Sequence, residues 1–220
     1  MSFLTFSLSD IISAQGEEPV KSFLSSFKCS LNPEAEEFLK NTSVRHERRG
    51  ISRTYLMIER DDVGEDFTIL GYYTLAIKCF VVNEEDEIPR KILTQMNVNR
   101  NVAQSYLFGQ LAKADGAEKG FGRIMMDHVI KTFETGYRMF GCRTIRLDCR
   151  DEPGLVKYYE SQGFVSIGRN HDNELPDGHN NLITLVSVDG TVKSRTQNTL
   201  LYALRKRCIP FFSSSSDAVA

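Results

Sequence analysis

The sequence predicts an α/β protein with a mixed central β-sheet flanked by helices. Two runs rich in β-branched and aromatic residues in the first half predict an antiparallel hairpin, because only a short turn separates them. In the second half, strand and helix patterns alternate, which is typical of parallel strands joined by crossovers. A chain of 220 residues is long enough to bury a substantial core around such a sheet.

The predicted elements are, in chain order, a helix, two hairpin strands, a strand, a long helix, a strand, a short helix and two strands. Their ranges are 32–48, Thr54–Ile58, Phe67–Phe80, Ser105–Ala112, 120–140, Thr144–Cys149, Leu155–Gln162, Phe164–Gly168 and Asn181–Val188. Asn32 can cap the first helix and Pro33 suits its first turn. Met125, Val129, Phe133 and Tyr137 form an apolar stripe, which indicates one buried face on the long helix.

Glycines and charged runs set the limits of these elements. Gly50 and Gly163 end the first and the last helix, since glycine readily adopts the conformation that follows a helix. Four successive acids at positions 84–87 predict a solvated loop rather than a ligand cluster. The final strand is expected to close the sheet. We expect residues 1–190 to form a single domain, and residues 191–220, which contain a run of serines, to form a partly disordered C-terminal extension.

Composition and charge narrow the class of protein. Hydrophobic residues make up 41% and charged residues 25% of the chain, which excludes a collagen-like, disordered or disulfide-stapled protein. No apolar run is long enough for a membrane span, and residues 1–16 lack a secretory signal, so we expect a cytoplasmic protein without a membrane partner. With a net charge of -2, any nucleic-acid partner would need a local basic patch.

The cysteines and histidines predict neither disulfides nor a metal site. The five cysteines are scattered without a C-x-x-C pair, a pattern typical of reduced thiols in a cytosolic protein. The four histidines show no zinc-ligand spacing. Cys149 lacks a histidine partner at a recognisable spacing, so we expect a buried strand thiol there rather than a nucleophile.

The segment A-E-K-G-F-G-R at residues 117–123 is the first one that suggests a ligand. Gly120 and Gly122 allow a tight turn, so that several N–H groups can converge on one anion at the positive end of the following helix. Arg123 could add a charge-assisted contact to the same anion. By itself this pattern is also compatible with a glycine-rich turn that binds nothing. It is not a P-loop, since no Gly-Lys-Ser/Thr follows.

Three segments in the same order, S-Y-L-F-G-Q-L-A, E-K-G-F-G-R and L-V-K-Y-Y-E-S-Q-G-F, together resemble the GNAT superfamily of acetyl-CoA-dependent N-acetyltransferases. The resemblance extends over residues 51–188 and implies a GNAT-like mixed sheet, with acetyl-CoA as cosubstrate. In that family a bulged strand leads into the loop that binds the CoA pyrophosphate, and a later helix ends in Y-E-x-x-G-F. Ala117 and Glu152 depart from the family, which usually has glutamine or arginine at the first position and asparagine near the second.

The resemblance also implies the roles of individual residues. Leu111 and Lys113 would offer backbone groups to the pantetheine and the acetyl carbonyl. The loop would bind the pyrophosphate through Glu118, Lys119, Gly120, Phe121, Gly122 and Arg123. Tyr159, rather than Tyr158, would protonate the leaving sulfur as general acid, because it directly precedes Glu160 and a tyrosine keeps its proton at neutral pH. Alternatively, both tyrosines simply pack in the core, and we assign no general base.

The acceptor of the acetyl group is the least defined part of the prediction. R-x-x-R-R-G-I-S-R-T from Arg45, L-G-Y-Y-T-L-A and Y-L-F-G-Q-L-A are similar to a GNAT subgroup of toxins that acetylate aminoacyl-tRNA. Arg45, Arg48, Arg49 and Arg53 could contact tRNA phosphates, or they could form an ordinary solvated helix end.

The leading prediction is an N-acetyltransferase that moves the acetyl group to an unidentified primary amine by direct attack in a ternary complex. The toxin-type reaction on aminoacyl-tRNA is one alternative. A non-catalytic CoA-binding regulatory module is another, since a fold does not fix its function. The oligomeric state is not determined by the sequence, and a homodimer is one possibility.

Overall fold

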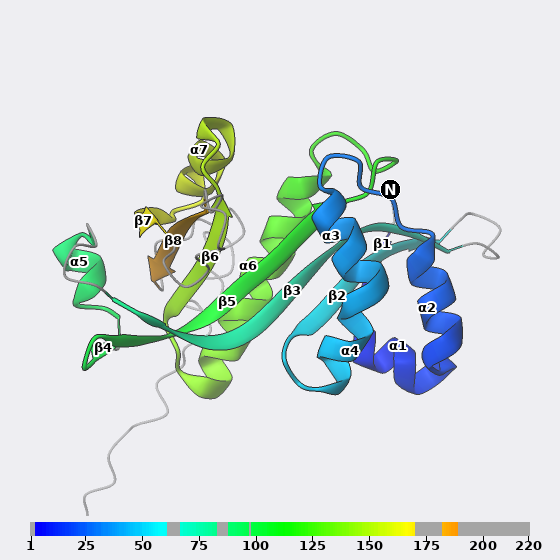
Figure 1. The fold of residues 1–220 in the computed structure, drawn as a ribbon, viewed down its shortest axis with the longest axis horizontal. Helices are drawn as coiled ribbons and strands as arrows, with labels where there is room; N and C mark the ends of the chain where they lie inside the picture. The colour runs from blue at the N-terminus through cyan, green and yellow to red at the C-terminus, as the bar shows by residue number, and fades with distance from the viewer. Residues whose placement is uncertain (1–2, 61–66, 83–87, 97, 170–181, 189–220) are drawn as a thin grey trace, which may run out of the picture.

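The computed structural model describes residues 3–60, 67–82, 88–96, 98–169 and 182–188, which form an eight-stranded sheet with helices on both faces (Figure 1). The strand order is β1-β2-β3-β5-β6-β8-β7, and β4 pairs with β5 outside this order. The strands are β1 Phe3–Ser7, β2 Arg53–Arg60, β3 Phe67–Val81, β4 Val98–Asn99, β5 Val102–Lys113, β6 Thr144–Arg150, β7 Val165–Arg169 and β8 Leu182–Val188. The predicted mixed α/β class is confirmed.

The helices contribute both long and short pieces to the two outer layers. They are α1 Leu8–Gln15, α2 Glu17–Ser25, α3 Pro33–Glu37, the π-helical turn η1 Phe38–Thr42, α4 Ser43–Arg48, α5 Arg90–Leu93, α6 Phe121–Phe140 and α7 Pro153–Ser161. In the part of the chain that the structure describes, no helix is long and apolar enough to cross a membrane.

Two consecutive tyrosines of β3 show how the faces of the sheet are covered. The Tyr72 hydroxyl donates to the Ala35 carbonyl of α3 at 2.5 Å, and its ring packs edge-on against Phe27. Tyr73 instead places its hydroxyl 3.1 Å from Thr132 Oγ1 of α6. Because successive side chains of a strand point to opposite faces, α3 and α6 lie on opposite sides of the sheet (Figure 1). We call these sides the α3 face and the α6 face.

The helix predicted over residues 32–48 is present, but it is interrupted. Its start follows the prediction, since the Asn32 side chain accepts a hydrogen bond from the Ala35 amide at 3.2 Å and Pro33 occupies the first turn. The turn η1 then separates α3 from α4. After this turn, the Ser43 hydroxyl donates to the Leu39 carbonyl. The buried apolar residues Ala35, Leu39 and Val44 are spaced by four and then by five residues, and the step of five spans this turn. A single longer step is too weak a pattern to predict a π-helical turn, which is rare.

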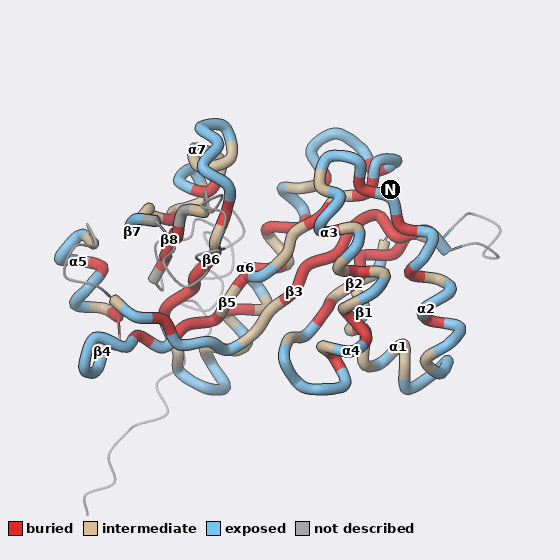
Figure 2. Tube along the Cα trace, viewed as in Figure 1, coloured by how far each residue is buried: buried red, intermediate tan, exposed pale blue. Residues whose placement is uncertain are grey.

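The N-terminal segment forms elements that the sequence patterns did not predict. Strand β1 pairs with β2 at the edge of the sheet, and α1 and α2 follow it. The Phe3 ring packs edge-on against Phe121 at 5.4 Å, and Thr5 Oγ1 lies 3.2 Å from His128 Nδ1. These contacts connect the N-terminus to the start of α6. Figure 2 shows that buried residues follow the strands through the middle of the molecule, while exposed residues dominate the outer helices.

The order of the last strands differs from the prediction. The pairing of β5 with β6 is parallel, as expected. However, β8 does not close the sheet at its edge: it lies between β6 and β7 and is antiparallel to both. Consequently β6 and β7, which flank α7 in the sequence, are not paired. The predicted acidic loop at 84–87 and the predicted extension at 191–220 lie outside the described residues.

Candidate functional site

Two neighbouring strands separate where the predicted site lies. β5 and β6 pair in parallel only as far as Phe108 and Leu147, although both strands continue. We call the parts of β5 and β6 that no longer pair with each other, residues 109–113 and 148–150, the fork. In Figure 1 the strands diverge toward α7 and toward the loop that precedes α6. A ligand placed along the fork would meet free backbone groups of the strands, because strand pairing has ended there.

A bulge in β5 marks the base of the fork. Opposite β3, Thr74 pairs with Gln110 and Leu75 pairs with Phe108, so Gly109 is an extra residue on β5. A Cβ atom at Gly109 would lie 2.9 Å from Thr74 Oγ1, so any other residue here would force the Thr74 side chain or the strand to shift. Bulges re-aim the groups that follow them, here the predicted site residues Leu111 and Lys113. The bulged strand that the family resemblance implied is therefore present.

The loop between β5 and α6 presents backbone N–H groups. Gly120 has a φ of 91°, a conformation that favours glycine. Within the described residues, four amides of the predicted site make no hydrogen bond, those of Glu118, Lys119, Gly120 and Gly122. The Phe121 amide already donates to the Glu118 carbonyl, and the Phe121 side chain is buried in the core. Phe121 therefore supports the loop from inside, whereas its four neighbours leave donors open.

Three contacts hold this loop in place. Lys113 Nζ donates to the Ala117 carbonyl at 2.7 Å. The Asp115 carboxylate accepts hydrogen bonds from the Ser30 amide at 2.9 Å and from the Ser30 hydroxyl at 2.7 Å. The Asp115 amide donates to the Lys28 carbonyl. No sequence pattern indicated Ser30 or the contact of the Lys113 side chain with the loop, because the partners are distant in sequence or belong to the backbone.

The two tyrosines of α7 have different surroundings. Tyr159 is 8% exposed, and its ring packs edge-on against Phe108 and Phe164. Burial raises the pKa of the Tyr159 hydroxyl. The Tyr158 hydroxyl donates to the Gly122 carbonyl at 3.4 Å, which connects α7 to the first turn of α6. The structure thus brings Tyr159, the bulged strand and the loop together, and it also packs the Tyr159 ring in the core.

The four arginines of the predicted tRNA patch do not act alike. Arg48 pairs with Glu17 at 2.8 Å, and Arg53 pairs with the buried Glu47 at 2.6 Å. Arg45 and Arg49 are exposed. Burial of His46, together with the positive charges of Arg45, Lys78 and Arg49, lowers the pKa of its imidazole.

Two of the four arginines thus have a carboxylate partner, and Arg45 and Arg49 have none among the described residues. Lys78 of β3, which the sequence pattern did not associate with the arginines, also contributes positive charge at His46. No motif could have predicted this effect, since Lys78 belongs to β3, which is distant from α4 in sequence.

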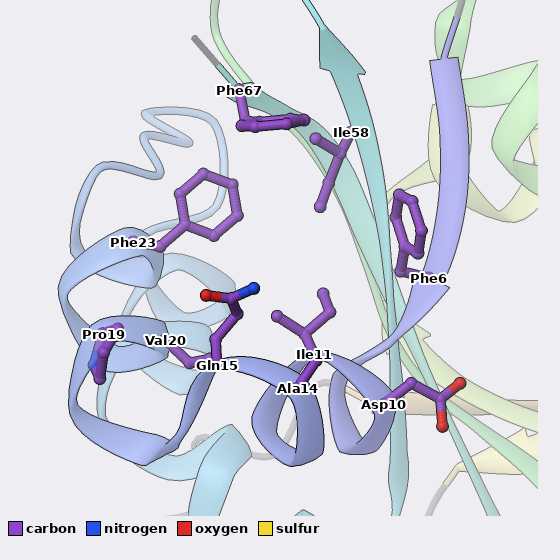
Figure 3. A pocket seen from close by; sticks show the side chains of 10 residues that line it. All are labelled: Phe6, Asp10, Ile11, Ala14, Gln15, Pro19, Val20, Phe23, Ile58 and Phe67. Carbon is purple, nitrogen blue, oxygen red and sulfur yellow. The ribbon is translucent and has the colours of Figure 1, made fainter. Parts of the chain in front are cut away.

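A hollow is lined by residues other than those of the fork. It has a volume of about 600 Å³ and lies between α1, α2 and the strands β1 to β3. Its lining includes Phe6, Ile11, Val20, Phe23, Ile58 and Phe67. Figure 3 shows the rings of Phe6, Phe23 and Phe67 around this space. The lining is mainly apolar, and it holds none of the predicted site residues.

Comparison with known proteins identifies related folds among solved structures. No protein-family model and no curated protein matches the chain. A tyrosine-to-phenylalanine mutant of KacT is 20% identical, with a TM-score of 0.60, covering 84% of this chain and 94% of that one. AtaT complexed with acetyl-methionyl-tRNAfMet is 19% identical, with a TM-score of 0.60, covering 91% and 99%. A tyrosine-to-phenylalanine mutant of the AtaT toxin, bound to the C-terminus of the antitoxin AtaR and acetyl-CoA, is 18% identical, with a TM-score of 0.55, covering 84% and 92%.

These likenesses show the fold of the chain. The GNAT-like mixed sheet and the likeness to the toxin subgroup, both predicted from the three sequence segments, are confirmed at the level of fold. At identities of 18–20%, neither the reaction nor the acceptor follows from the fold alone.

Proposed function

We propose that the chain is an N-acetyltransferase that transfers the acetyl group of acetyl-CoA directly to a primary amine. The observation that carries this proposal is the arrangement at the fork: unpaired amides at the start of α6 lie next to a helix that carries a buried tyrosine. The hydrogen bond from Tyr158 to Gly122 connects these two parts. A non-catalytic CoA-binding module would need the amides but not the tyrosine hydroxyl.

The residues of the fork fit acetyl-CoA as a cosubstrate. The open amides of Glu118, Lys119, Gly120 and Gly122 and the positive end of α6 would bind the pyrophosphate, with Arg123 as an additional cation. Leu111 and Lys113 would direct backbone groups to the pantetheine and the acetyl carbonyl. The AtaT mutant that shares this fold is bound to acetyl-CoA.

Acyl transfer needs a donor for the developing oxyanion and a proton for the leaving sulfur. Backbone amides after the bulge at Gly109 can donate hydrogen bonds to the developing oxyanion. Tyr159 is proposed as the general acid for the sulfur. No hydrogen bond joins its hydroxyl to another described residue, so the proton stays available to a bound thioester. The raised pKa keeps this hydroxyl protonated well above neutral pH.

A second candidate concerns the acceptor, which we propose to be the amino group of aminoacyl-tRNA. Two observations favour it. AtaT, which has this fold, was solved with acetyl-methionyl-tRNAfMet. In this chain, the positive charges of Arg45, Arg49 and Lys78 all act on His46, and such cations can contact phosphates.

Two measurements test the proposed function. Titration calorimetry with acetyl-CoA should detect binding, and absence of binding would remove the proposal. Incubation with labelled acetyl-CoA and three acceptor pools should then identify the product: polyamines with amino acids, cell protein, and charged tRNA. Label in the tRNA pool alone supports the second candidate, and label in another pool excludes it. Binding without transfer to any pool would favour the regulatory module instead.

A further inference from the structure

A carboxylate outside the predicted site lies at the base of the fork. Asp148 is the first residue of β6 after its last pair with β5, and Gly109 is the corresponding residue of β5. The Asp148 side chain is 17% exposed, so it is largely enclosed and still reaches solvent. The two residues at the branching point of the strands are thus a glycine without a side chain and an acid.

Asp148 lies on the opposite face of the sheet from Tyr159. Phe108 packs against both Tyr159 and Phe133 of α6, so Tyr159 lies on the α6 face. Leu147 is the partner of Phe108 in the sheet and shares its face, so the next residue, Asp148, is on the α3 face. An independent contact agrees with this assignment. The guanidinium of Arg146, two residues before Asp148, lies 5.1 Å from the centre of the Phe80 ring. Phe80 shares the α3 face with Tyr72, eight residues earlier on the same strand.

Neighbouring side chains fix the Asp148 carboxylate. Arg146 donates from Nε to Oδ1 at 3.3 Å and from Nη2 to Oδ2 at 3.1 Å. The Thr184 hydroxyl of β8 donates to Oδ1 at 2.8 Å. A carboxylate offers about four acceptor positions, and Oδ2 has one donor among the described residues. The carboxylate is therefore held in one orientation with an acceptor position open.

We propose that Asp148 binds the amino group of the acceptor on the α3 face of the fork, with Arg146 and Thr184 as positioning residues. This inference rests on the proposed acetyltransferase function. A thioester lying in the fork has Tyr159 on one side, so an amine can approach its carbonyl carbon from the other side, where Asp148 lies. The acceptor class is a primary amine, because the open position accepts an N–H and the negative charge favours a nitrogen that becomes positive.

With these groups, the acetyl transfer proceeds directly from thioester to amide. The amine nitrogen forms a bond to the acetyl carbon, and the C–S bond breaks with its electron pair on sulfur. Sulfur takes the Tyr159 proton, which water replaces. The nitrogen, positively charged during the attack, loses its extra proton to water. Asp148 stabilises that charge and takes no proton itself, consistent with a carboxylate that is already paired with Arg146.

The test compares Asp148→Asn with the wild type and with Glu18→Gln, which removes a carboxylate that is 83% exposed and remote from the fork. Three quantities are measured: affinity for acetyl-CoA, hydrolysis of acetyl-CoA without acceptor, and acetylation of spermidine and of charged tRNA. We expect the variant to keep its affinity and hydrolysis rate, since water carries no ammonium charge. Amine acetylation should fall about 100-fold, and Glu18→Gln should match the wild type in all three.

Other outcomes overturn the inference. Unchanged amine acetylation in Asp148→Asn excludes a contact with the amine, and an equal loss of hydrolysis assigns Asp148 to the thioester or to the fold. If the wild type does not bind acetyl-CoA, the proposed function fails and this inference fails with it.

If Asp148→Asn does not fold, Thr184→Val is the variant that tests the inference. It removes one hydrogen bond to Oδ1 and should lower amine acetylation about 5-fold with hydrolysis unchanged. Wild-type acetylation in this variant would contradict the positioning role and, with it, the inference.

Discussion

At the scale of single residues, burial determines what Tyr159 can do. Its ring fills the core beside Phe108 and Phe164 while the raised pKa keeps its proton. Packing in the core and acting as an acid are therefore compatible, although they appear as alternatives in the sequence. The motif Y-E-x-x-G-F singled out this residue, but only the structure shows that Tyr158 has a separate contact, with the first turn of α6.

Replacing Tyr159 by phenylalanine tests the general acid. The loss of the hydroxyl should lower kcat by about 100-fold or more, while the affinity for acetyl-CoA stays unchanged because the ring keeps its packing. Steady-state kinetics and calorimetry give the two quantities. Tyr158→Phe is the matched comparison and should lower kcat about 3-fold or less, since it loses one long hydrogen bond. Equal losses in the two variants would contradict the assignment.

A second residue-scale prediction concerns acid stability. The Glu36 carboxylate accepts the Cys29 amide at 2.7 Å and bonds to Lys40, and these contacts lower the pKa of Glu36 to about 2. A lowered pKa in the folded state stabilises the protein above the unfolded value of 4.5, and this contribution disappears as pH falls toward 2.

Glu36→Gln should therefore melt at a lower temperature than the wild type at pH 7. The difference should shrink below pH 4.5, and thermal melts between pH 7 and pH 3 measure it. Glu37→Gln, a neighbouring exposed carboxylate, is the control. A difference that persists undiminished at pH 3 would mean that packing rather than charge is responsible.

At the scale of elements, helix starts and buried helix faces, which depend on neighbouring residues, were predicted correctly. The order of strands in the sheet, which depends on pairing between distant segments, was predicted poorly. Asn32 and Pro33 start α3 where expected. Met125, Val129 and Phe133 are buried on α6 as the apolar stripe predicted, whereas its last member, Tyr137, is half-buried. The position of β8 in the sheet was not predictable, because the residue pattern of a strand does not indicate which strands it pairs with. The fork escaped prediction for the same reason: its defining property is an absent pairing between β5 and β6.

The loop before α6 gives an element-scale prediction. A Cβ atom at Gly122 meets no atom within 4 Å, so Gly122→Val should fold and yet fill the space in front of the open amides. Affinity for acetyl-CoA should fall at least about 10-fold, as expected from the loss of one to two hydrogen bonds to a charged group. Gly116→Val, also in open space on this loop, is the control. Calorimetry that finds equal affinity for both variants and the wild type would exclude the amides as the pyrophosphate site.

At the scale of the whole molecule, charge is nearly balanced, and only local groups can attract an anion. The net charge of -2 gives no general affinity for RNA. Arg48 and Arg53 are partly neutralised by Glu17 and Glu47, which leaves Arg45 and Arg49 as the arginines of the predicted patch that form no ion pair with another described residue. Sequence alone counted four equivalent arginines, because ion pairs between distant elements leave no trace in a motif.

Binding of charged tRNA as a function of salt tests this patch. The double variant Arg45→Ala, Arg49→Ala should bind more weakly at low salt, and the slope of log K against log salt should decrease by about 2, one for each lost phosphate contact. Arg48→Ala should keep the wild-type slope. An unchanged slope in the double variant would place any RNA contact elsewhere.

The insertion of β8 between β6 and β7 has a consequence for synthesis of the chain. A ribosome finishes Arg150 and Ser161 well before Leu182, so the growing polypeptide emerges with one flank of β6 bare and with Thr184 still missing beside Asp148. The site around Asp148 is then completed in a single late step, when residues 182–188 pair with β6 and β7 as strand β8. A truncated translation product that ends before this stretch should be inert.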